Sequence, residues 1–232
     1  MKKNKIKNKK RGEYVLLDSK SSVMEAYRLI RTNIEFSAAS DGNKSILITS
    51  SVPNEGKSTV ATNLARAFAQ TGYKTLLVDL DLRKPVVYKI FNIPGDVGVT
   101  SVITGKVGLN DAIKATEENN LYVLPSGVRP VNPSEFLRSS ATENLVRFLK
   151  SKFDIVIIDS PPAIAVADAS IISTYVDSTL LVTSANFTDY RCVNDAINNL
   201  KNVNANLLGV ILNNVNVKGS SYSYKYGYYN YK

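Results

Sequence analysis

The chain has 232 residues, 44% of them hydrophobic, and a formal net charge of +9 at pH 7. This length and composition predict one α/β domain with a full hydrophobic core. The sequence contains no histidine, which excludes imidazole catalysis and histidine-ligated metals, and its single cysteine, Cys192, excludes an internal disulfide. No apolar run approaches transmembrane length and no signal-peptide pattern is found, so we expect a soluble chain.

The first eleven residues are strongly basic. Their seven positive charges, with no acid among them, come from Lys2, Lys3, Lys5, Lys7, Lys9, Lys10 and Arg11. We expect residues 1–17 to form a flexible, solvated segment. A second interpretation is weak affinity for anionic lipid, at about 1 kcal/mol per basic residue near the surface. Nucleic acid ranks last as a partner, because the folded part of the sequence carries no RNA- or DNA-binding module.

Residues 18–39 are predicted to form a helix that enters the domain, capped by Ser21 or Ser22. One face of this helix is apolar and consists of Met24, Tyr27, Ile30 and Ile34. Another face carries charged residues at a spacing of three, namely Glu25, Arg28 and Arg31. From the spacing alone, the charged face is an ordinary solvated surface with a salt bridge of little energetic value.

A phosphate-binding loop is predicted between a buried strand at residues 46–49 and a helix at residues 60–69. The loop runs Ser50-Ser51-Val52-Pro53-Asn54-Glu55-Gly56-Lys57-Ser58-Thr59. The first turn of the helix offers unpaired N–H groups and the positive end of its dipole, which together bind polyphosphate. Lys57 is placed to reach the β- and γ-phosphates, and the Ser58 hydroxyl to bind Mg²⁺. Ser51 stands where the usual G-x-x-x-x-G-K-S/T pattern has its first glycine, so a chance Gly-Lys-Ser at a helix start is the alternative.

Two further strands end in acidic residues. The segment 76–83 carries Asp79 and Asp81 at positions i and i+2, so we expect both side chains to project the same way from an extended segment. The segment 156–162 is an apolar strand that ends in Asp159. A carboxylate at a strand end is often only a helix cap or a solvated group. Beside a phosphate loop, however, such carboxylates favour a Mg²⁺ site, because this metal takes oxygen ligands.

The remaining chain alternates between predicted strands and helices. Strands are expected over residues 75–79, 121–124, 154–159, 178–183 and 207–213. Helices are expected over residues 133–149, interrupted near 139–140, and over 167–175 and 189–202. Residues 84–120 are less regular, around two short helical pieces. The alternation predicts an α/β fold with a P-loop NTPase-like parallel sheet and helices on both faces, forming a single domain over residues 18–217.

The C-terminal segment, residues 218–232, is rich in tyrosine. It holds six of the chain's 13 tyrosines: Tyr222, Tyr224, Tyr226, Tyr228, Tyr229 and Tyr231. Alternating tyrosines are compatible with an edge strand. The segment has almost no aliphatic residues, however, so we expect a flexible tail. A tyrosine-rich tail beside a nucleotide site is typical of a kinase that phosphorylates itself.

The three nucleotide motifs resemble those of the bacterial tyrosine kinases of the capsular and exopolysaccharide CpsD/CapB type. That family's first motif has three apolar residues followed by S/T-S-x-x-P-G-E-G-K-S/T-T, and residues 46–59 match it except that Asn54 replaces a glycine. Asparagine tolerates positive φ better than most residues, so the loop is expected to keep its shape. Residues 76–83 match the second motif, an apolar triplet and D-x-D-x-R. Residues 156–162 match the third, an apolar triplet and D-x-P-P, and the resemblance covers nearly the whole chain.

This resemblance implies a protein-tyrosine kinase that depends on ATP and Mg²⁺. Its catalytic residues would be Lys57, Asp79, Asp81 and Asp159. Among these, Asp79 would accept the proton of the tyrosine hydroxyl. Its nucleotide would be held by Pro53, Asn54, Glu55, Gly56, Lys57, Ser58 and Thr59. Its Mg²⁺ would be held directly by Ser58, and directly or through water by Asp81 and Asp159.

The resemblance also implies partners and a cellular role. The kinase would phosphorylate the six tail tyrosines in trans, on a neighbouring subunit, and regulate the synthesis and export of capsular or extracellular polysaccharide. Glu25, Arg28 and Arg31 match the E-x-x-R-x-x-R motif through which the family's subunits assemble as a ring. Family members of the separate, soluble type are activated by a transmembrane adaptor of the chain-length regulator type. We therefore expect a location in the cytoplasm at the inner face of the cell membrane, and a cognate tyrosine phosphatase as a further partner.

A partitioning or positioning ATPase of the ParA/MinD type shares this fold and is the main alternative. It would act as a nucleotide-switched binding module. Those proteins place a second lysine five positions before the motif lysine, where this chain has Val52, and they lack a tyrosine-rich tail. A catalytically weak scaffold whose tail binds partners is a third hypothesis. Mapping phosphotyrosine after incubation with ATP and Mg²⁺ separates the three.

Overall fold

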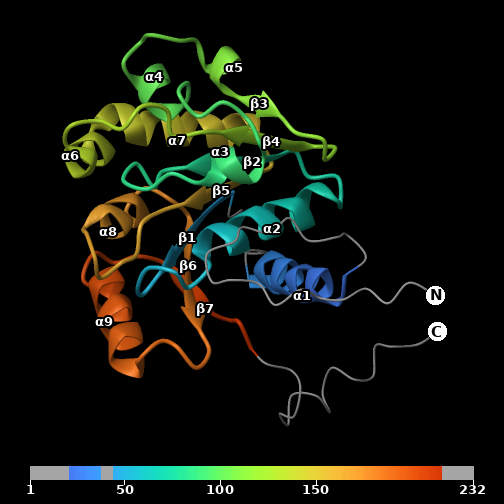
Figure 1. Ribbon diagram of the computed structural model, residues 1–232, viewed down its shortest axis with the longest axis vertical. Coiled ribbons are helices and arrows are strands. Elements are labelled where there is room, and N and C mark those ends of the chain that lie inside the picture. Colours follow the sequence, from blue (N-terminus) through green and yellow to red (C-terminus); the bar gives the residue numbers. More distant parts are fainter. Residues whose placement is uncertain (1–20, 38–43, 216–232) are drawn as a thin grey trace.

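A seven-stranded sheet forms the centre of the computed structural model, which describes residues 21–37 and 44–215 (Figure 1). The strand order is β3-β4-β2-β5-β1-β6-β7. The strands are β1 (Ser45–Ser50), β2 (Thr75–Asp79), β3 (Lys114–Ala115), β4 (Leu121–Leu124), β5 (Ile155–Asp159), β6 (Ser178–Ser184) and β7 (Leu207–Asn213).

Neighbouring strands pair in parallel, apart from one edge pair. In the register of the sheet, Ile48 of β1 and Asp79 of β2 both lie opposite Asp159 of β5. The carboxyl ends of these three central strands therefore meet at one edge, where open α/β sheets bind their ligands. The prediction of a parallel sheet is confirmed for six strands, but β3 pairs antiparallel with β4. Two residues are too short to show a strand pattern, so the sequence did not predict β3.

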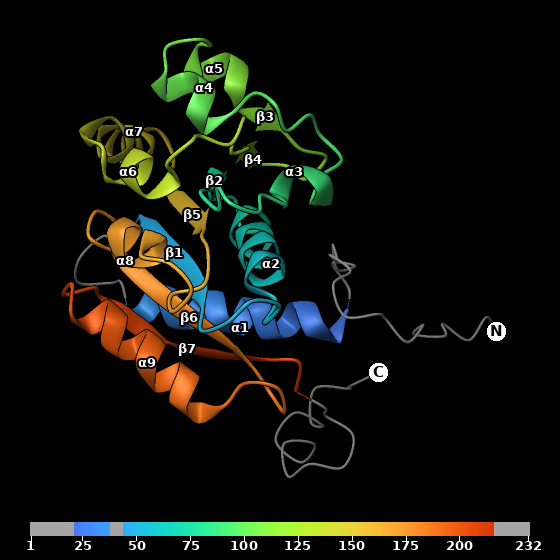
Figure 2. The same ribbon diagram turned by 60° about the vertical axis from the view of Figure 1, so that its left-hand side comes forward.

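Helices cover both faces of the sheet, as predicted (Figure 2). They are α1 (Ser22–Ser37), α2 (Lys57–Ala69), α3 (Val87–Ile90), α4 (Val99–Ile103), α5 (Leu109–Ala112), α6 (Pro133–Arg138), α7 (Ser140–Lys152), α8 (Asp168–Ser173) and α9 (Tyr190–Lys201). One apolar cluster joins α1 and α2 to one face of the sheet, and a second joins α7 and α8 to the other. Between residues 84 and 120 the structure has three short helices, where the sequence predicted two.

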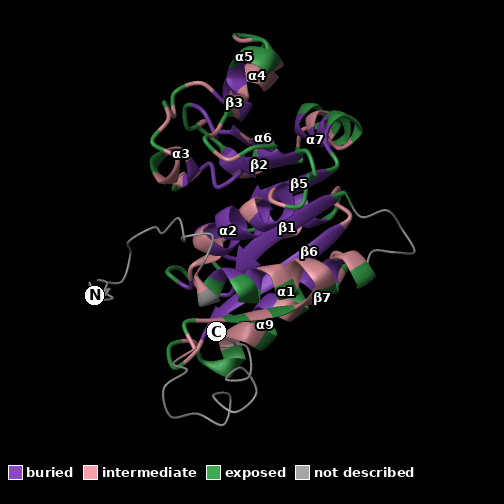
Figure 3. Ribbon diagram, turned by 90° about the vertical axis from the view of Figure 1, so that its right-hand side faces the viewer, coloured by how far each residue is buried: buried purple, intermediate pink, exposed green. Residues whose placement is uncertain are grey.

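Burial follows from the residue pattern of each element. The central strands are buried along their whole length, as Figure 3 shows, because helices cover both of their faces. In α2, Leu64 and Phe68 are fully buried against the sheet, and each such side chain contributes about 1.5–3 kcal/mol to stability. On α1, the predicted apolar face is confirmed, since Met24, Tyr27 and Ile34 are buried.

The predicted interruption between α6 and α7 is also confirmed. Ser139 leaves the helical conformation, with ψ at 144°, and its hydroxyl accepts a hydrogen bond from the backbone N–H of Thr142. Ser139 is thus the N-cap of α7, which explains why one predicted helix is two. The basic segment 1–17, residues 38–43 and the tail tyrosines lie outside the described residues.

Candidate active site

The phosphate-binding loop connects the end of β1 to the start of α2. Asn54 and Gly56 both have left-handed backbone conformations, with φ of 68° and 89°. The expectation that asparagine tolerates the loop's shape is therefore confirmed. At its tip, Pro53 and Asn54 are exposed. The loop leads directly into α2, whose first turn, from Lys57 through Thr59, presents backbone N–H groups that have no partner within the helix.

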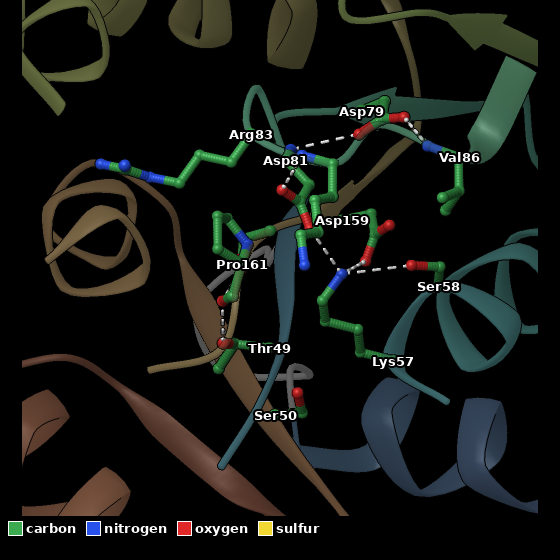
Figure 4. Close-up of polar contacts among 12 residues, drawn as sticks. Thr49, Ser50, Lys57, Ser58, Asp79, Asp81, Arg83, Val86, Asp159 and Pro161 are labelled. Atoms are coloured by element: carbon green, nitrogen blue, oxygen red, sulfur yellow. Dashed lines mark hydrogen bonds and ion pairs between the residues drawn. The ribbon is translucent and has the colours of Figure 1, made fainter. Parts of the chain in front are cut away.

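Three segments that are far apart in the sequence meet at Lys57 (Figure 4). Its Nζ donates to Asp81 Oδ2 at 2.9 Å and to the Ser58 hydroxyl at 3.2 Å. The same Nζ lies 3.6 Å from Asp159 Oδ1. The structure thus brings together Lys57, Ser58, Asp81 and Asp159, four of the residues that the sequence predicted for one site.

Neighbouring charges and burial shift the pKa values of Lys57 and Asp159. Burial works to lower the pKa of Lys57, but the Asp159 and Asp81 carboxylates outweigh it and hold that pKa above its ordinary value. Burial raises the pKa of the Asp159 carboxyl, although the Lys57 ammonium opposes the shift. A cluster of mutually perturbed charges at the end of a parallel sheet is typical of a functional site.

The Asp159 carboxylate fits a role as a metal ligand. It is fully buried, and among the described residues neither of its oxygens has a hydrogen-bond partner. Oδ1 does form a 3.6 Å ion pair with Lys57, but buried oxygens without hydrogen bonds need an explanation, such as an ion that they hold. The Asp159 oxygens, the Ser58 hydroxyl and Asp81 gather around Lys57 Nζ, and they are oxygen ligands of the kind that Mg²⁺ prefers. The residues present therefore fit a magnesium ion.

Asp79 does not lie as the sequence predicted. Its Oδ1 accepts the backbone N–H of Asp81, and its Oδ2 accepts those of Val86 and Val87, each at 3.1 Å. Figure 4 shows its carboxylate directed at Val86, whereas Asp81 faces Lys57. The two side chains diverge because β2 ends at Asp79, so the two-residue period of a strand does not extend to Asp81. Burial and the neighbouring Asp159 raise the pKa of Asp79 above its ordinary value, against those backbone hydrogen bonds.

Arg83, the last residue of the second motif, connects the segment after β2 to α6 and α8. Its guanidinium donates to both Asp168 oxygens, at 2.7 and 3.1 Å, and to the Ser134 hydroxyl at 2.8 Å. Asp168 is fully buried at the start of α8, and Ser134 lies in α6. The sequence analysis missed Asp168 and Ser134. Their only signal was Arg83 itself, because the planar guanidinium of an arginine commonly binds a carboxylate through two parallel hydrogen bonds.

The charged residues of α1 are divided between solvent and the domain. Arg28 pairs with Glu25 at 2.7 Å on the surface, which confirms the predicted salt bridge. Arg31 instead donates to the backbone oxygen of Ala67 in α2 at 3.0 Å and lies 3.5 Å from Glu35. The three residues therefore do not form one continuous exposed set.

With this geometry in place, comparison with known proteins decides the family. A family model described as an AAA domain matches residues 43–214. Tyrosine-protein kinase YwqD of Bacillus subtilis (strain 168) is 41% identical over 232 residues, covering 100% of this chain and 97% of that protein. The chain belongs to the bacterial tyrosine-protein kinases. Tyrosine-protein kinase etk of Escherichia coli (strain K12) is 32% identical over 205 residues, covering 88% of this kinase and 28% of that protein.

Solved structures agree with this assignment. The chimerical protein CapA2B2 matches this kinase with a TM-score of 0.81 and 42% identity, over 84% of the kinase and 86% of that chain. The septum site-determining protein MinD from Pyrococcus horikoshii OT3, complexed with Mg-ADP, matches with a TM-score of 0.61 and 28% identity. That match covers 73% of the kinase and 69% of MinD. The predicted family, the P-loop fold class and the tyrosine-kinase class of enzyme are thereby confirmed.

Proposed function

We propose that this kinase transfers the γ-phosphoryl group of Mg²⁺-bound ATP to tyrosine at the site built around Lys57. The observation that carries the proposal is the convergence of Lys57, Asp81 and Asp159 at the first turn of α2. The Mg-ADP of the MinD structure supports the choice of nucleotide and metal, because MinD shares the fold. The related ParA/MinD type of switch is less well supported, since Val52 stands in place of its second lysine.

Each residue of the site has a proposed task. Lys57 and the N–H groups of residues 54–59 bind the phosphates and stabilise the charge that develops during transfer. Ser58, Asp81 and Asp159 hold Mg²⁺, which neutralises phosphate charge when it is bound. Asp79 accepts the proton of the tyrosine hydroxyl, and burial beside Asp159 raises its pKa towards the range that suits a general base. Its Oδ1 accepts one hydrogen bond and so keeps a lone pair for this proton, but the carboxylate is fully buried and must become accessible to the tyrosine.

The proposed acceptors are the six tail tyrosines of another copy of the chain, and the proposed role is control of polysaccharide synthesis and export. A mixing experiment tests transfer between copies. A Lys57→Met chain with an intact tail is incubated with Mg²⁺-ATP and a chain whose six tail tyrosines are phenylalanine. Phosphotyrosine on the Lys57→Met chain, located by mass spectrometry, is the expected result. Its absence, while the wild-type chain modifies its own tail, would contradict transfer in trans.

The same proposal includes assembly and a membrane partner. Glu25, Arg28 and Arg31 would contact a neighbouring copy in a ring, and a cognate phosphatase would reverse the modification. Within residues 21–37 and 44–215, no helix is long and apolar enough to cross a bilayer. Recruitment to the inner face of the membrane would then come from a transmembrane adaptor. Adding the adaptor's cytoplasmic segment should stimulate tail phosphorylation, and equal activity without it would contradict this part.

A further inference from the structure

Glu55 lies within the phosphate-binding loop, but its side chain turns away from the solvent and into the protein. The residue is fully buried. Its Oε2 accepts the backbone N–H of Val52 at 2.7 Å, which closes the loop on itself. Its Oε1 accepts the backbone N–H of Ser184 at 3.2 Å and a hydrogen bond from the Thr188 hydroxyl. One carboxylate therefore connects the loop to the turn between β6 and α9.

A second connection reaches the same loop from the end of β7. Asn213 Nδ2 donates to the backbone oxygen of Glu55 at 2.8 Å. The next residue in the loop, Gly56, leaves no room for a side chain there, because a Cβ would lie 2.3 Å from that nitrogen. The loop is thus fixed from β6 and from β7, on the side away from Asp81.

The charge of Glu55 makes this arrangement unexpected. Both of its oxygens accept hydrogen bonds from backbone N–H groups, which is the acceptor-only pattern of a carboxylate. Among the ion pairs between described residues, none includes Glu55. A carboxylate behind a loop that binds polyphosphate repels the ligand. Its electrostatic effect on nucleotide affinity is therefore unfavourable, and a favourable contribution must come from geometry.

We propose that Glu55 is a positioning residue, and that the turn at residues 184–188 is part of the nucleotide site. The three hydrogen bonds of Glu55 hold the N–H groups around Gly56 and Lys57 in the arrangement that receives the phosphates. Such preorganisation raises affinity because the loop loses less freedom on binding. The inference rests on the proposed nucleotide site. It adds Glu55, Ser184 and Thr188 as residues that support the phosphate-binding loop from behind.

Replacing Glu55 with glutamine distinguishes charge repulsion from loop positioning, because the two predict opposite changes in Mg²⁺-ADP affinity. Glutamine has one acceptor oxygen and one donor group, so it cannot serve both Val52 N–H and Ser184 N–H. If charge were decisive, Glu55→Gln would bind Mg²⁺-ADP more tightly than wild type. If positioning is decisive, it binds about tenfold more weakly, which corresponds to about 1.4 kcal/mol. We expect the weaker binding.

Two substitutions at Thr188 test its hydrogen bond to Glu55 without changing any charge. Thr188→Val has nearly the same shape but removes the hydroxyl, so we expect Mg²⁺-ADP affinity to fall about threefold to tenfold. Thr188→Ser keeps the hydroxyl and should retain wild-type affinity. The matched control for the loss of one negative charge is Glu117→Gln, at an exposed position on the chain between β3 and β4.

Calorimetry with Mg²⁺-ADP on the full-length chains gives the affinities, and kinetics with ATP give kcat and KM. For Glu55→Gln we expect KM to rise by the same factor as the dissociation constant, with a smaller change in kcat. Amide exchange should accelerate at residues 52–58 and stay slow in β5. Wild-type chain that fails to bind Mg²⁺-ADP would refute the nucleotide site itself. Normal wild-type binding, with Glu55→Gln equal or tighter and Thr188→Val unchanged, would overturn only the positioning role.

Discussion

Lys57 Nζ lies 2.9 Å from Asp81 Oδ2, at the point where the phosphate-binding loop meets the end of β2. The same ammonium group is 3.6 Å from Asp159, so one cation neutralises two carboxylates, one at the end of β5 and one just after β2. Buried charges are strongly unfavourable unless they are paired. Lys57 therefore carries two tasks in the proposed mechanism, because it pairs with the acidic residues and also faces the phosphates.

Replacing Lys57 with methionine should remove both tasks. Loss of charge stabilisation of this kind typically costs about 3–4 kcal/mol in the transition state, or about 10²–10³ in rate. We expect tail phosphorylation, measured by mass spectrometry, to become barely detectable. The urea midpoint should also fall, since Asp81 and Asp159 lose their cation. Lys106→Met, at an exposed position, is the control. Undiminished phosphorylation in Lys57→Met would refute the site.

Asp81→Asn and Asp159→Asn should uncouple nucleotide binding from the metal. In the wild type, Mg²⁺ is expected to tighten ADP binding, because these carboxylates attract the ion. In either variant this gain should shrink by about tenfold or more, which corresponds to about 1.4 kcal/mol. ADP binding in EDTA should stay the same or improve, since one negative charge is gone. Calorimetric titrations with ADP, with and without Mg²⁺, measure this gain in affinity, and Asp111→Asn is the control. If Mg²⁺ tightens ADP binding in both variants as much as in the wild type, the two carboxylates do not hold the metal.

Asp79→Asn distinguishes structural support from base catalysis. Asparagine can accept on one side only, so it leaves either the Asp81 N–H or the pair at Val86 and Val87 without a partner. We expect a stability loss of about 1–3 kcal/mol, measured by urea unfolding. If Asp79 is also the base, phosphoryl transfer should fall by about 10²–10⁴ while Mg²⁺-ADP binding persists. A folded variant with nearly full kinase activity would exclude the base role.

The elements of the site that the sequence predicted were those with a local signal. The strands ending at Asp79 and Asp159 are apolar runs followed by an acid, and β2 has the predicted bounds. The loop could be recognised because its shape depends on a few residues in a row, with Gly56 and Asn54 at the left-handed positions. Such signals are contained within about ten residues of the chain.

The remaining parts depend on contacts between distant segments. Glu55 bonds to residues 129 and 133 positions away, and Arg83 bonds to a residue 85 positions away. A side chain that binds a backbone N–H across the fold leaves no period or motif in the sequence. For that reason Glu55 was assigned to the nucleotide, and Asp79 was expected to point with Asp81. In both cases the tertiary structure decides which way a correctly placed residue faces.

Asp177 should make stability depend on pH in the acid range. Partial burial works to raise its pKa, but hydrogen bonds from Lys150 and from the backbone N–H groups of Ser45 and Lys44 outweigh it. The folded-state pKa therefore lies below the unfolded value of about 3.9. A depressed carboxyl pKa adds stability above the unfolded pKa, and this stability is lost as the pH falls through the folded pKa.

Asp177→Asn tests this linkage. At pH 7 we expect the variant to be less stable by about 1–2 kcal/mol, a value kept low because the carboxylate is partly solvated. The difference from wild type should narrow below about pH 4. Urea midpoints measured at several pH values would reveal the trend. A stability gap that stays constant from pH 7 down to pH 3 would contradict the assigned pKa direction.

Arg28 and Arg31 should differ in how their loss affects assembly and folding. Arg28 pairs with Glu25 near the surface, whereas Arg31 contacts the Ala67 backbone oxygen in α2. Arg28→Ala should therefore reduce the oligomer seen by light scattering without changing the urea midpoint by more than about 0.5 kcal/mol. Arg31→Ala should weaken assembly and also destabilise the domain by about 1–2 kcal/mol, because α1 loses a hydrogen bond to α2. Equal stability of the two variants would contradict the division of roles on α1. A wild-type chain that stays monomeric at high concentration would instead remove the ring model.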